Sequence, residues 1–133
     1  MVHVRSSRHA DDPVPSQRGA ANPRRGRHDL FGERRRTVAE SVDRVARLGA
    51  ALRDLGIDDG DRVAIYGLNS DRYHEALLAI PWAGAVLNPV NTRWSPQEIA
   101  YSLVDCQSDT LIVDEHFVDL VPALRAQAPT SAR

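Results

Sequence analysis

Apolar residues recur along this chain with two different periods. Over residues 38–55 they recur every three or four positions, which is typical of one face of an amphipathic helix. Thr37 and Glu40 have the spacing of a capping box at the start of this helix, and Gly56 favours the left-handed backbone that ends helices. The short apolar run at residues 63–66 then predicts a buried strand. The apolar face of the helix consists of Val38, Val42, Val45, Leu48, Leu52 and Leu55.

The same succession of helix and strand follows a second time. Asn69 or Ser70 is placed to cap a helix, and Asp71 suits its positive first turn. We expect Pro81 to kink or end this helix. Residues 85–87 predict a second strand, which Pro89 ends because proline cannot donate to a strand ladder. The buried side of the helix is expected to carry Tyr73, Ala76, Leu77 and Ile80.

A third succession completes the pattern. Ser95 and Glu98 form another capping box, with a proline at the first helical position, and the helix is anchored by Ile99, Tyr101 and Leu103. Residues 110–113 predict a third strand. Asp114 is expected to cap a last helix that Pro122 interrupts; its apolar positions are Phe117, Leu120, Val121 and Leu124.

This alternation predicts an α/β fold with a partial parallel sheet of about three strands and helices packed on it. Connections between such strands are almost always right-handed crossovers. A thin sheet leaves an open edge, so we expect self-association or a partner chain. The strand residues expected to lack cover on one face are Val63, Ile65, Val86, Leu87, Leu111 and Val113.

Charge is unevenly distributed along the chain. All 17 basic residues are arginines, and residues 1–36 are net positive while the remainder is net negative. Residues 1–30 have few large aliphatic side chains and no apolar periodicity, so they predict a disordered arginine-rich arm. Its arginines suit nucleic acid or acidic lipid, but a solvated tail is the simpler interpretation, and nucleic-acid binding is not favoured. Residues 31–133 are expected to form the ordered domain.

Composition excludes several classes of protein. No run of about 18 apolar residues is present, so we predict no membrane span. No apolar signal-peptide core occurs in residues 2–30. The single cysteine, Cys106, excludes an internal disulfide and a cysteine-based zinc site, which favours a cytoplasmic protein.

The sequence GLNSDR, at residues 67–72, is the first candidate for chemistry. It follows a strand and opens a helix, which is where open α/β sheets bind phosphates. It has one glycine, however, and neither G-x-G-x-x-G nor Gly-Lys-Ser/Thr is present. We therefore favour a helix cap over a phosphate site.

The other candidates are weaker and favour structural roles. His74, which has Glu75 beside it, and His116 are potential general bases. No serine, cysteine or second acid is tied to either histidine by local spacing, so exposed helix positions are the simpler interpretation. Three acids at residues 58–61 lack the spacing of an EF-hand loop and predict a solvated turn. The arginines at 34–36 are expected to be solvated, and the two tryptophans are expected to be packing residues. These acids and tryptophans are Asp58, Asp59, Asp61, Trp82 and Trp94.

From residue 31 to about residue 130 the chain resembles the amino-terminal region of the AMP-forming acyl-CoA synthetases. The resemblance rests on five segments that occur in the family's order. They are RRRTVAESVDRVARLGAALRDLGI, GDRVAIYGLNSDRYHEALLAI, PWAGAVLNPVNTR, SPQEIAYSLVDC and LIVDE. By this resemblance the GDRVAI strand and the helix that follows it are scaffold and not the nucleotide loop.

The resemblance implies activation of a carboxylate by ATP to acyl-AMP, followed by transfer to coenzyme A. The family's phosphate loop, its acids for Mg²⁺ and ribose, and its catalytic lysine lie downstream of the matched region, and this chain contains no lysine. No catalytic, cofactor-binding or metal-binding residue is therefore assigned. We expect an amino-terminal fragment from a truncated, split or frameshifted gene, inactive alone, whose partner is the remainder of the synthetase or a second copy. The alternative is a stand-alone α/β interaction module.

Overall fold

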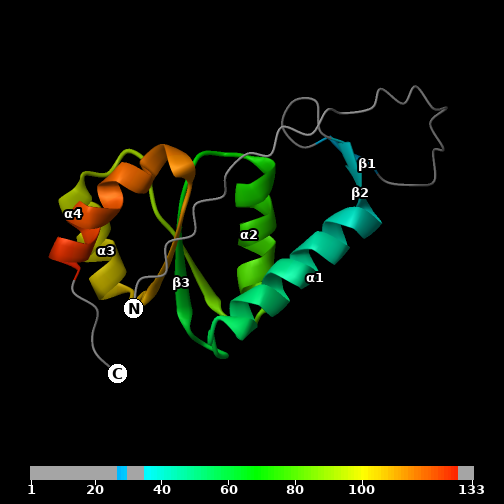
Figure 1. Cartoon of the computed structure of the whole chain (residues 1–133), viewed down its shortest axis with the longest axis horizontal. Coiled ribbons are helices and arrows are strands. Elements are labelled where there is room, and N and C mark those ends of the chain that lie inside the picture. Colours follow the sequence, from blue (N-terminus) through cyan, green and yellow to red (C-terminus); the bar gives the residue numbers. More distant parts are fainter. Residues whose placement is uncertain (1–26, 30–34, 129–133) are drawn as a thin grey trace.

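The computed structural model describes residues 27–29 and 35–128 (Figure 1). Within these residues a three-stranded sheet has the order β4-β3-β5 and a separate two-stranded sheet pairs β1 with β2. The elements in chain order are β1 (Arg27–Asp29), β2 (Arg35–Thr37), α1 (Val38–Asp54), β3 (Arg62–Tyr66), α2 (Asp71–Trp82), β4 (Val86–Pro89), α3 (Pro96–Asp105), β5 (Thr110–Val113), the 3₁₀ helix η1 (Glu115–Leu120) and α4 (Val121–Gln127).

The central strand β3 is parallel to both of its neighbours. Arg62 pairs with Val86 of β4, and Val63 pairs with Thr110 of β5. Helices cover both faces of this sheet, with α1 and α2 on one face and α3 and α4 on the other (Figure 1). This arrangement confirms the predicted α/β fold with a three-stranded parallel sheet.

Alternate residues of β3 divide the core into two clusters. Val63 and Ile65 pack against α1 and α2, whereas Ala64 and Tyr66 pack against α3 and α4. The prediction that the strands lack cover on one face is therefore wrong for Val63, Ile65, Leu111 and Val113, which are all buried. It is confirmed for Val86, which is 52% exposed on the edge strand β4. Crossover helices on both faces supply the cover that a one-sided layer would lack.

The predicted helix starts are confirmed. Thr37 and Ser95 each form a capping box with the glutamate three residues later. Ser70, and not Asn69, caps α2. Gly56 follows α1 with a φ of 85°, in the left-handed region expected of a helix end. These starts and stops depend on neighbours within a few residues, which is why the sequence reveals them.

Three residues of the helices were assigned to the core incorrectly. Val38 and Val42 are 46% and 48% exposed, because the first turns of α1 extend beyond the sheet that covers the rest of the helix (Figure 1). Tyr101 is 70% exposed and does not anchor α3. Pro122 also differs from expectation: it stands in the first turn of α4, where a missing N–H costs nothing, so it begins a helix instead of interrupting one.

Residues 27–29 were predicted to belong to a disordered arm, but they form β1, antiparallel to β2. Strand pairing uses backbone groups and needs no apolar periodicity, so the composition of the arm gave no sign of it. The remainder of the predicted arm lies outside the described residues. None of the described helices combines the length and the apolar character needed to cross a membrane.

Candidate functional site

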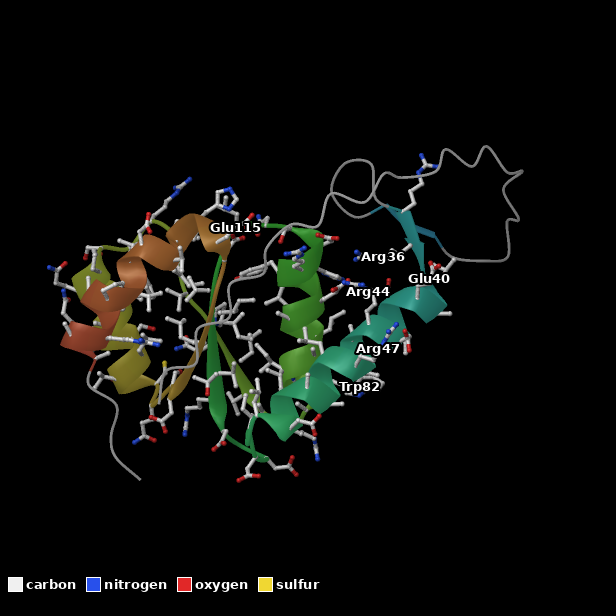
Figure 2. The ribbon with its side chains drawn as sticks, in the orientation of Figure 1. Arg36, Glu40, Arg44, Arg47, Trp82 and Glu115 are labelled. Carbon is white, nitrogen blue, oxygen red and sulfur yellow. The ribbon has the colours of Figure 1, made fainter. Side chains whose placement is uncertain are left out.

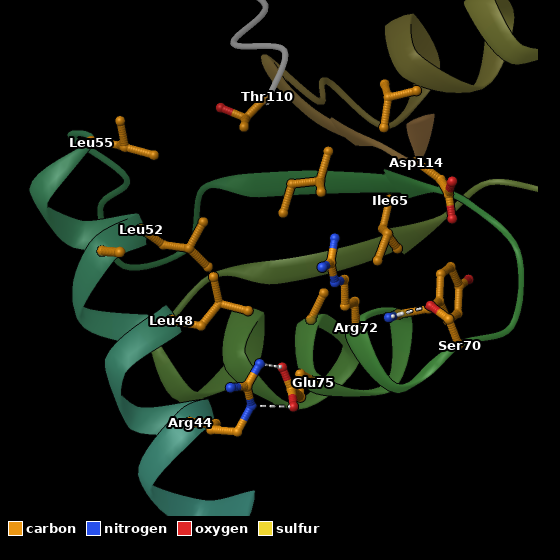
Figure 3. A pocket seen from close by; sticks show the side chains of 15 residues that line it. Arg44, Leu48, Leu52, Leu55, Ile65, Ser70, Arg72, Glu75, Thr110 and Asp114 are labelled. Carbon is orange, nitrogen blue, oxygen red and sulfur yellow. Dashed lines mark hydrogen bonds and ion pairs between the residues drawn. The ribbon is translucent and has the colours of Figure 1, made fainter. Parts of the chain in front are cut away.

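A groove of about 400 Å³ lies between α1, α2 and the edge strand β5 (Figure 3). Its wall is built from aliphatic side chains of all three elements and of β3, among them Leu48, Leu52, Leu55, Ile65 and Ile112. Polar side chains also line it, including Arg44, Glu75, Ser70, Arg72, Thr110 and Asp114. A wall of this kind suits an apolar occupant, and two of its charged groups, Arg44 and Glu75, pair with each other.

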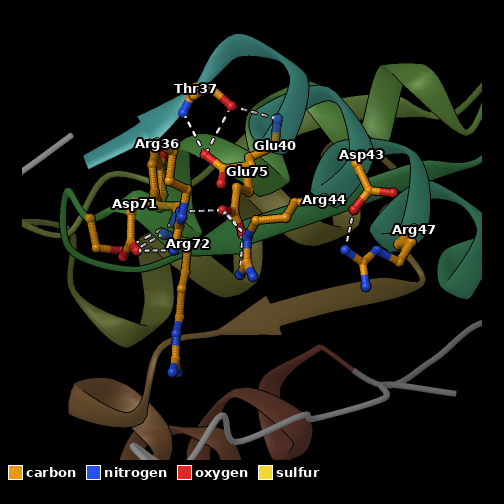
Figure 4. A network of polar contacts seen from close by, with 11 residues as sticks. Arg36, Thr37, Glu40, Asp43, Arg44, Arg47, Asp71, Arg72 and Glu75 are labelled. Atoms are coloured by element: carbon orange, nitrogen blue, oxygen red, sulfur yellow. Dashed lines mark hydrogen bonds and ion pairs between the residues drawn. The ribbon is translucent and has the colours of Figure 1, made fainter. Parts of the chain in front are cut away.

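A network of ion pairs joins β2, α1 and α2 beside this groove (Figure 4). The guanidinium of Arg36 donates to both Asp71, at 2.8 Å, and Glu75. The guanidinium of Arg44 donates to the two carboxylate oxygens of Glu75, at 2.6 and 3.0 Å. The two acids are one helical turn apart on α2, so they present both carboxylates to the same pair of arginines.

Burial makes this network energetically important. Asp71 and Glu75 are 8% and 6% exposed, and charged groups are rarely so buried unless they are paired. The hydrogen bond to Glu75 raises the pKa of Arg44 above its ordinary value. Glu75 is therefore an anchor between elements, and its carboxylate is not available to act with His74 as a base. His74 itself is half-buried on α2, and not exposed as the sequence suggested.

The loop from β3 to α2 carries the GLNSDR sequence, and its polar groups serve the fold. The Ser70 hydroxyl accepts a hydrogen bond from the Tyr73 N–H at 3.1 Å. A β-carbon added to Gly67 would stand 3.1 Å from Cβ of Asp114, so the glycine lets the ends of β3 and β5 approach. The Asp71 carboxylate binds Arg36 and occupies the helix N-terminus with negative charge. These features agree with a helix cap and do not fit a bound phosphate.

Asp114 and His116 form a second polar contact at the carboxyl end of β5. Nδ1 of His116 lies 2.7 Å from Oδ1 of Asp114, and the same oxygen accepts from the His116 N–H at 3.0 Å. This side-chain contact raises the pKa of His116. Burial raises the pKa of Asp114, but the hydrogen bonds from His116 outweigh burial and leave it lowered. The pair caps η1, and His116 is an exposed side chain.

The acids at residues 58–61 form the expected turn. Asp59 pairs with Arg53 at 3.1 Å, and Oδ2 of Asp61 accepts from the Asp58 N–H at 2.9 Å. Across residues 27–29 and 35–128, no three His, Cys, Asp or Glu side chains gather in a way that would hold a metal ion.

The remaining candidates differ from expectation. Arg36 is not a solvated residue but a 16%-exposed member of the ion-pair network, whereas Arg35 is exposed and Arg34 lies outside the described residues. Trp82 and Trp94 are 58% and 38% exposed, so neither is buried, although the Trp82 ring lies against Gly49 of α1 (Figure 2).

Comparison with known proteins agrees with this scaffold. The AMP-binding enzyme family matches residues 16–132. The chain belongs to this family. The long-chain-fatty-acid–CoA ligase of Thermus thermophilus is 45% identical over 96 residues, which are 72% of this chain and 18% of that enzyme. The 2-succinylbenzoate–CoA ligase of Arabidopsis thaliana is 41% identical over 86 residues, 65% of this chain and 15% of that enzyme.

A solved structure of a relative shows the same fold. The anthranilate CoA ligase in complex with anthranoyl-AMP is 29% identical and superposes with a TM-score of 0.69 over 74% of this chain and 19% of its own. The chain thus spans less than a fifth of the length of each of these three ligases. The acyl-CoA synthetase resemblance seen in the sequence motifs is confirmed.

Proposed function

We propose that this chain provides the amino-terminal scaffold of an AMP-forming acyl-CoA ligase, and that it does not form acyl-AMP alone. The supporting observation is that its one candidate phosphate loop, between β3 and α2, is fully occupied by structural contacts. Ser70 caps the helix, Gly67 accommodates Asp114, and the helix N-terminus holds the carboxylate of Asp71. These contacts support the proposal, and no step of the reaction is assigned to this loop.

The whole protein is proposed to activate a carboxylic acid with ATP and Mg²⁺ and to transfer the acyl group to coenzyme A. Stabilising charge on a transferring phosphoryl or adenylyl group takes metal ions and cationic side chains aimed at it. The two arginines of the ion-pair network, half-buried Arg36 and exposed Arg44, are neutralised by Asp71 and Glu75 and are aimed at α2. The role of the described residues is thus to hold a rigid layer on which such groups are mounted.

A long-chain fatty acid is the first substrate to test, because the relative that is 45% identical is a long-chain-fatty-acid–CoA ligase. Aromatic acids are the second class, because other relatives are ligases of 2-succinylbenzoate and anthranilate. A cytoplasmic location is proposed on the single cysteine, Cys106, which is free.

ATP–pyrophosphate exchange tests the claim that the chain is scaffold alone. Purified 133-residue chain is incubated with ATP, Mg²⁺, labelled pyrophosphate and each acid in turn. We expect no carboxylate-dependent exchange above the no-enzyme control. Exchange that depends on the acid and follows the protein peak in chromatography would contradict the proposal.

A further inference from the structure

The two edges of the three-stranded sheet differ in what they offer to another copy of the chain. Backbone N–H and C=O groups point to alternate sides along a strand, so only every second residue can pair outward. On β4, the N–H groups of Val86 and Val90 donate toward the β3 side, at 2.7 and 2.9 Å, so Leu87 and Pro89 face outward. Proline has no N–H to donate, and proline on an edge strand protects that edge against further pairing.

The edge of β5 has no such protection. The Asp114 N–H donates to the Tyr66 carbonyl of β3 at 2.9 Å. By the same alternation, Leu111 and Val113 direct their N–H and C=O groups away from the sheet. The strand Thr110–Val113 contains no charged residue and no proline, and most of its residues are β-branched. Across residues 27–29 and 35–128, β3 is the one strand that pairs with β5, so these outward groups face no other strand.

The outward groups of β5 match those of a second β5 that runs antiparallel to it. A two-fold axis that passes beside Ile112 places Leu111 of each copy opposite Val113 of the other. In an antiparallel pair, two opposed residues whose backbone groups face each other exchange both of their hydrogen bonds. All donors and acceptors of this register lie within β5, because Leu111 and Val113 are spaced symmetrically about Ile112.

The side chains suit the same register. Thr110 and Ile112 line the apolar groove and are half-buried, whereas Leu111 and Val113 are buried on the opposite face (Figure 3). Ile112 faces Ile112 of the other copy across the axis, at a non-hydrogen-bonded position, where opposed side chains come closest. Thr110 faces Asp114 of the other copy, so a hydroxyl donor is opposite a carboxylate acceptor. No like charges are opposed in this arrangement.

The difference between the two edges also determines how copies of the chain associate. A contact between the β5 edge of one copy and the β4 edge of the next would not close, and it would produce a filament. Pro89 opposes that contact, because the outward side of β4 has only the N–H of Leu87 to donate. A contact between two β5 edges uses the same surface on both copies, so it closes as a dimer.

We propose that two copies of the 133-residue chain associate through their β5 edges, antiparallel and centred on Ile112, so that their sheets form one continuous sheet. The proposal goes beyond the proposed function: it concerns an interaction surface, and adenylation by the chain has no bearing on it.

Cysteine cross-linking tests the register. In a Cys106→Ser background, which removes the one native thiol, Ile112→Cys places two thiols across the axis. The Cα atoms there would be about 4.5 Å apart, within the range of about 4.4–6.8 Å that a disulfide spans. Thr110→Cys is the matched control, because the two Thr110 positions would be about 13 Å apart along the strands. We expect mild oxidation to give a covalent dimer of Ile112→Cys and to leave Thr110→Cys without one.

Charge at Thr110 tests the contact without oxidation. Thr110→Asp places a carboxylate opposite Asp114 of the other copy, at both ends of the paired strands, and we expect about tenfold weaker association. Thr110→Lys, the matched variant, places an opposite charge there and should associate at least as tightly as the unmodified chain. Sedimentation equilibrium at several protein concentrations measures the association, and circular dichroism establishes that each variant is folded.

Hydrogen–deuterium exchange of the unmodified chain gives a third readout. Peptides containing residues 110–113 should exchange more slowly as the protein concentration rises, whereas peptides containing residues 85–89, on the edge that Pro89 protects, should not change.

Three outcomes would overturn the proposal. A chain that stays monomeric at every concentration, with no covalent dimer of Ile112→Cys, would show that β5 does not pair with itself. Equal cross-linking of the two cysteine variants, or equal weakening by the two Thr110 charges, would place the interface elsewhere or in another register. Slow exchange at residues 110–113 that does not depend on concentration would assign the edge to another segment of the same chain.

Discussion

The ion-pair network around Glu75 predicts a large cost for removing one charge. Glu75→Gln keeps the size of the side chain but leaves Arg36 and Arg44 facing a neutral amide. The arginines of this network make four contacts with Glu75 and Asp71, and two of the four are to Oε1 of Glu75. Glutamine keeps one acceptor oxygen, so it can retain only some of the hydrogen bonds that Glu75 accepts. The substitution therefore removes the negative charge that the two arginines share: Arg36 keeps its ion pair with Asp71, and Arg44 loses the only acid that the structure pairs with it in this network.

The magnitude follows from how deeply each partner lies. Removing one partner of a buried ion pair costs about 3–5 kcal/mol. Glu75 and Arg36 have side chains 8% and 16% exposed, but Arg44 is 43% exposed and regains water when its partner is lost. We therefore expect about 2–3 kcal/mol, at or just below the lower limit of that range. For a domain of this size such a loss lowers the thermal midpoint by about 10–20 °C.

Thermal unfolding followed by circular dichroism measures this cost at several protein concentrations. The matched control is Asp43→Asn, which neutralises an exposed acid paired with Arg47 one turn along α1. Exposed pairs of this kind contribute less than about 1 kcal/mol. A midpoint for Glu75→Gln no lower than that of Asp43→Asn would show that the network does not hold α1 and β2 to α2.

Three further predictions concern the carboxyl ends of the strands. Gly67→Ala should destabilise the fold by about 1–3 kcal/mol in urea unfolding, because its β-carbon meets Cβ of Asp114, which is attached to backbone. Gly49→Ala should lower the free energy of unfolding by less, because the atom nearest to the added β-carbon belongs to the exposed Trp82 ring, which can move, and because alanine favours a helix over glycine. Equal losses of stability for the two substitutions would refute the packing argument. In NMR titrations His116 should titrate above its ordinary pKa of 6.5, and Asp114→Asn should return it toward that value. The contact between Asp114 and His116 should stabilise the fold fully at pH values above the unfolded pKa of Asp114 and below the unfolded pKa of His116. This stabilisation should be lost as pH falls through the lowered pKa of Asp114, and also as pH rises through the raised pKa of His116. An unchanged His116 titration in the Asp114→Asn variant would contradict this prediction.

Local signals explain what the sequence could predict of the fold. The capping boxes at Thr37 and Ser95 and the turn at Gly56 are contained within a few residues, and the structure has each of them. The alternation of helices and apolar strands predicted a parallel sheet, because only that arrangement covers such strands. Apolar periodicity alone did not show where a helix extends past its sheet, which is why Val38 and Val42 were placed in the core.

Long-range contacts explain what the sequence could not predict. Arg36 reaches Glu75 across 39 positions and Arg44 reaches it across 31, and nothing local to either arginine distinguishes it from a solvated one. A partial signal was present: Asp71 and Glu75 stand one turn apart on the same helix face that carries Ala79, which is buried. Two acids on a buried face require cations from elsewhere in the chain.

The central claim is that this chain is a working amino-terminal scaffold of an acyl-CoA ligase. A chimeric ligase tests it most directly: the 96-residue segment of the Thermus thermophilus enzyme is replaced by the segment of this chain that aligns with it. ATP–pyrophosphate exchange with a long-chain fatty acid is then measured against the parent enzyme. We predict acid-dependent exchange within about 100-fold of the parent, the loss that a misplacement of about 1 Å can cause. A folded, monodisperse chimera without acid-dependent exchange would contradict the claim.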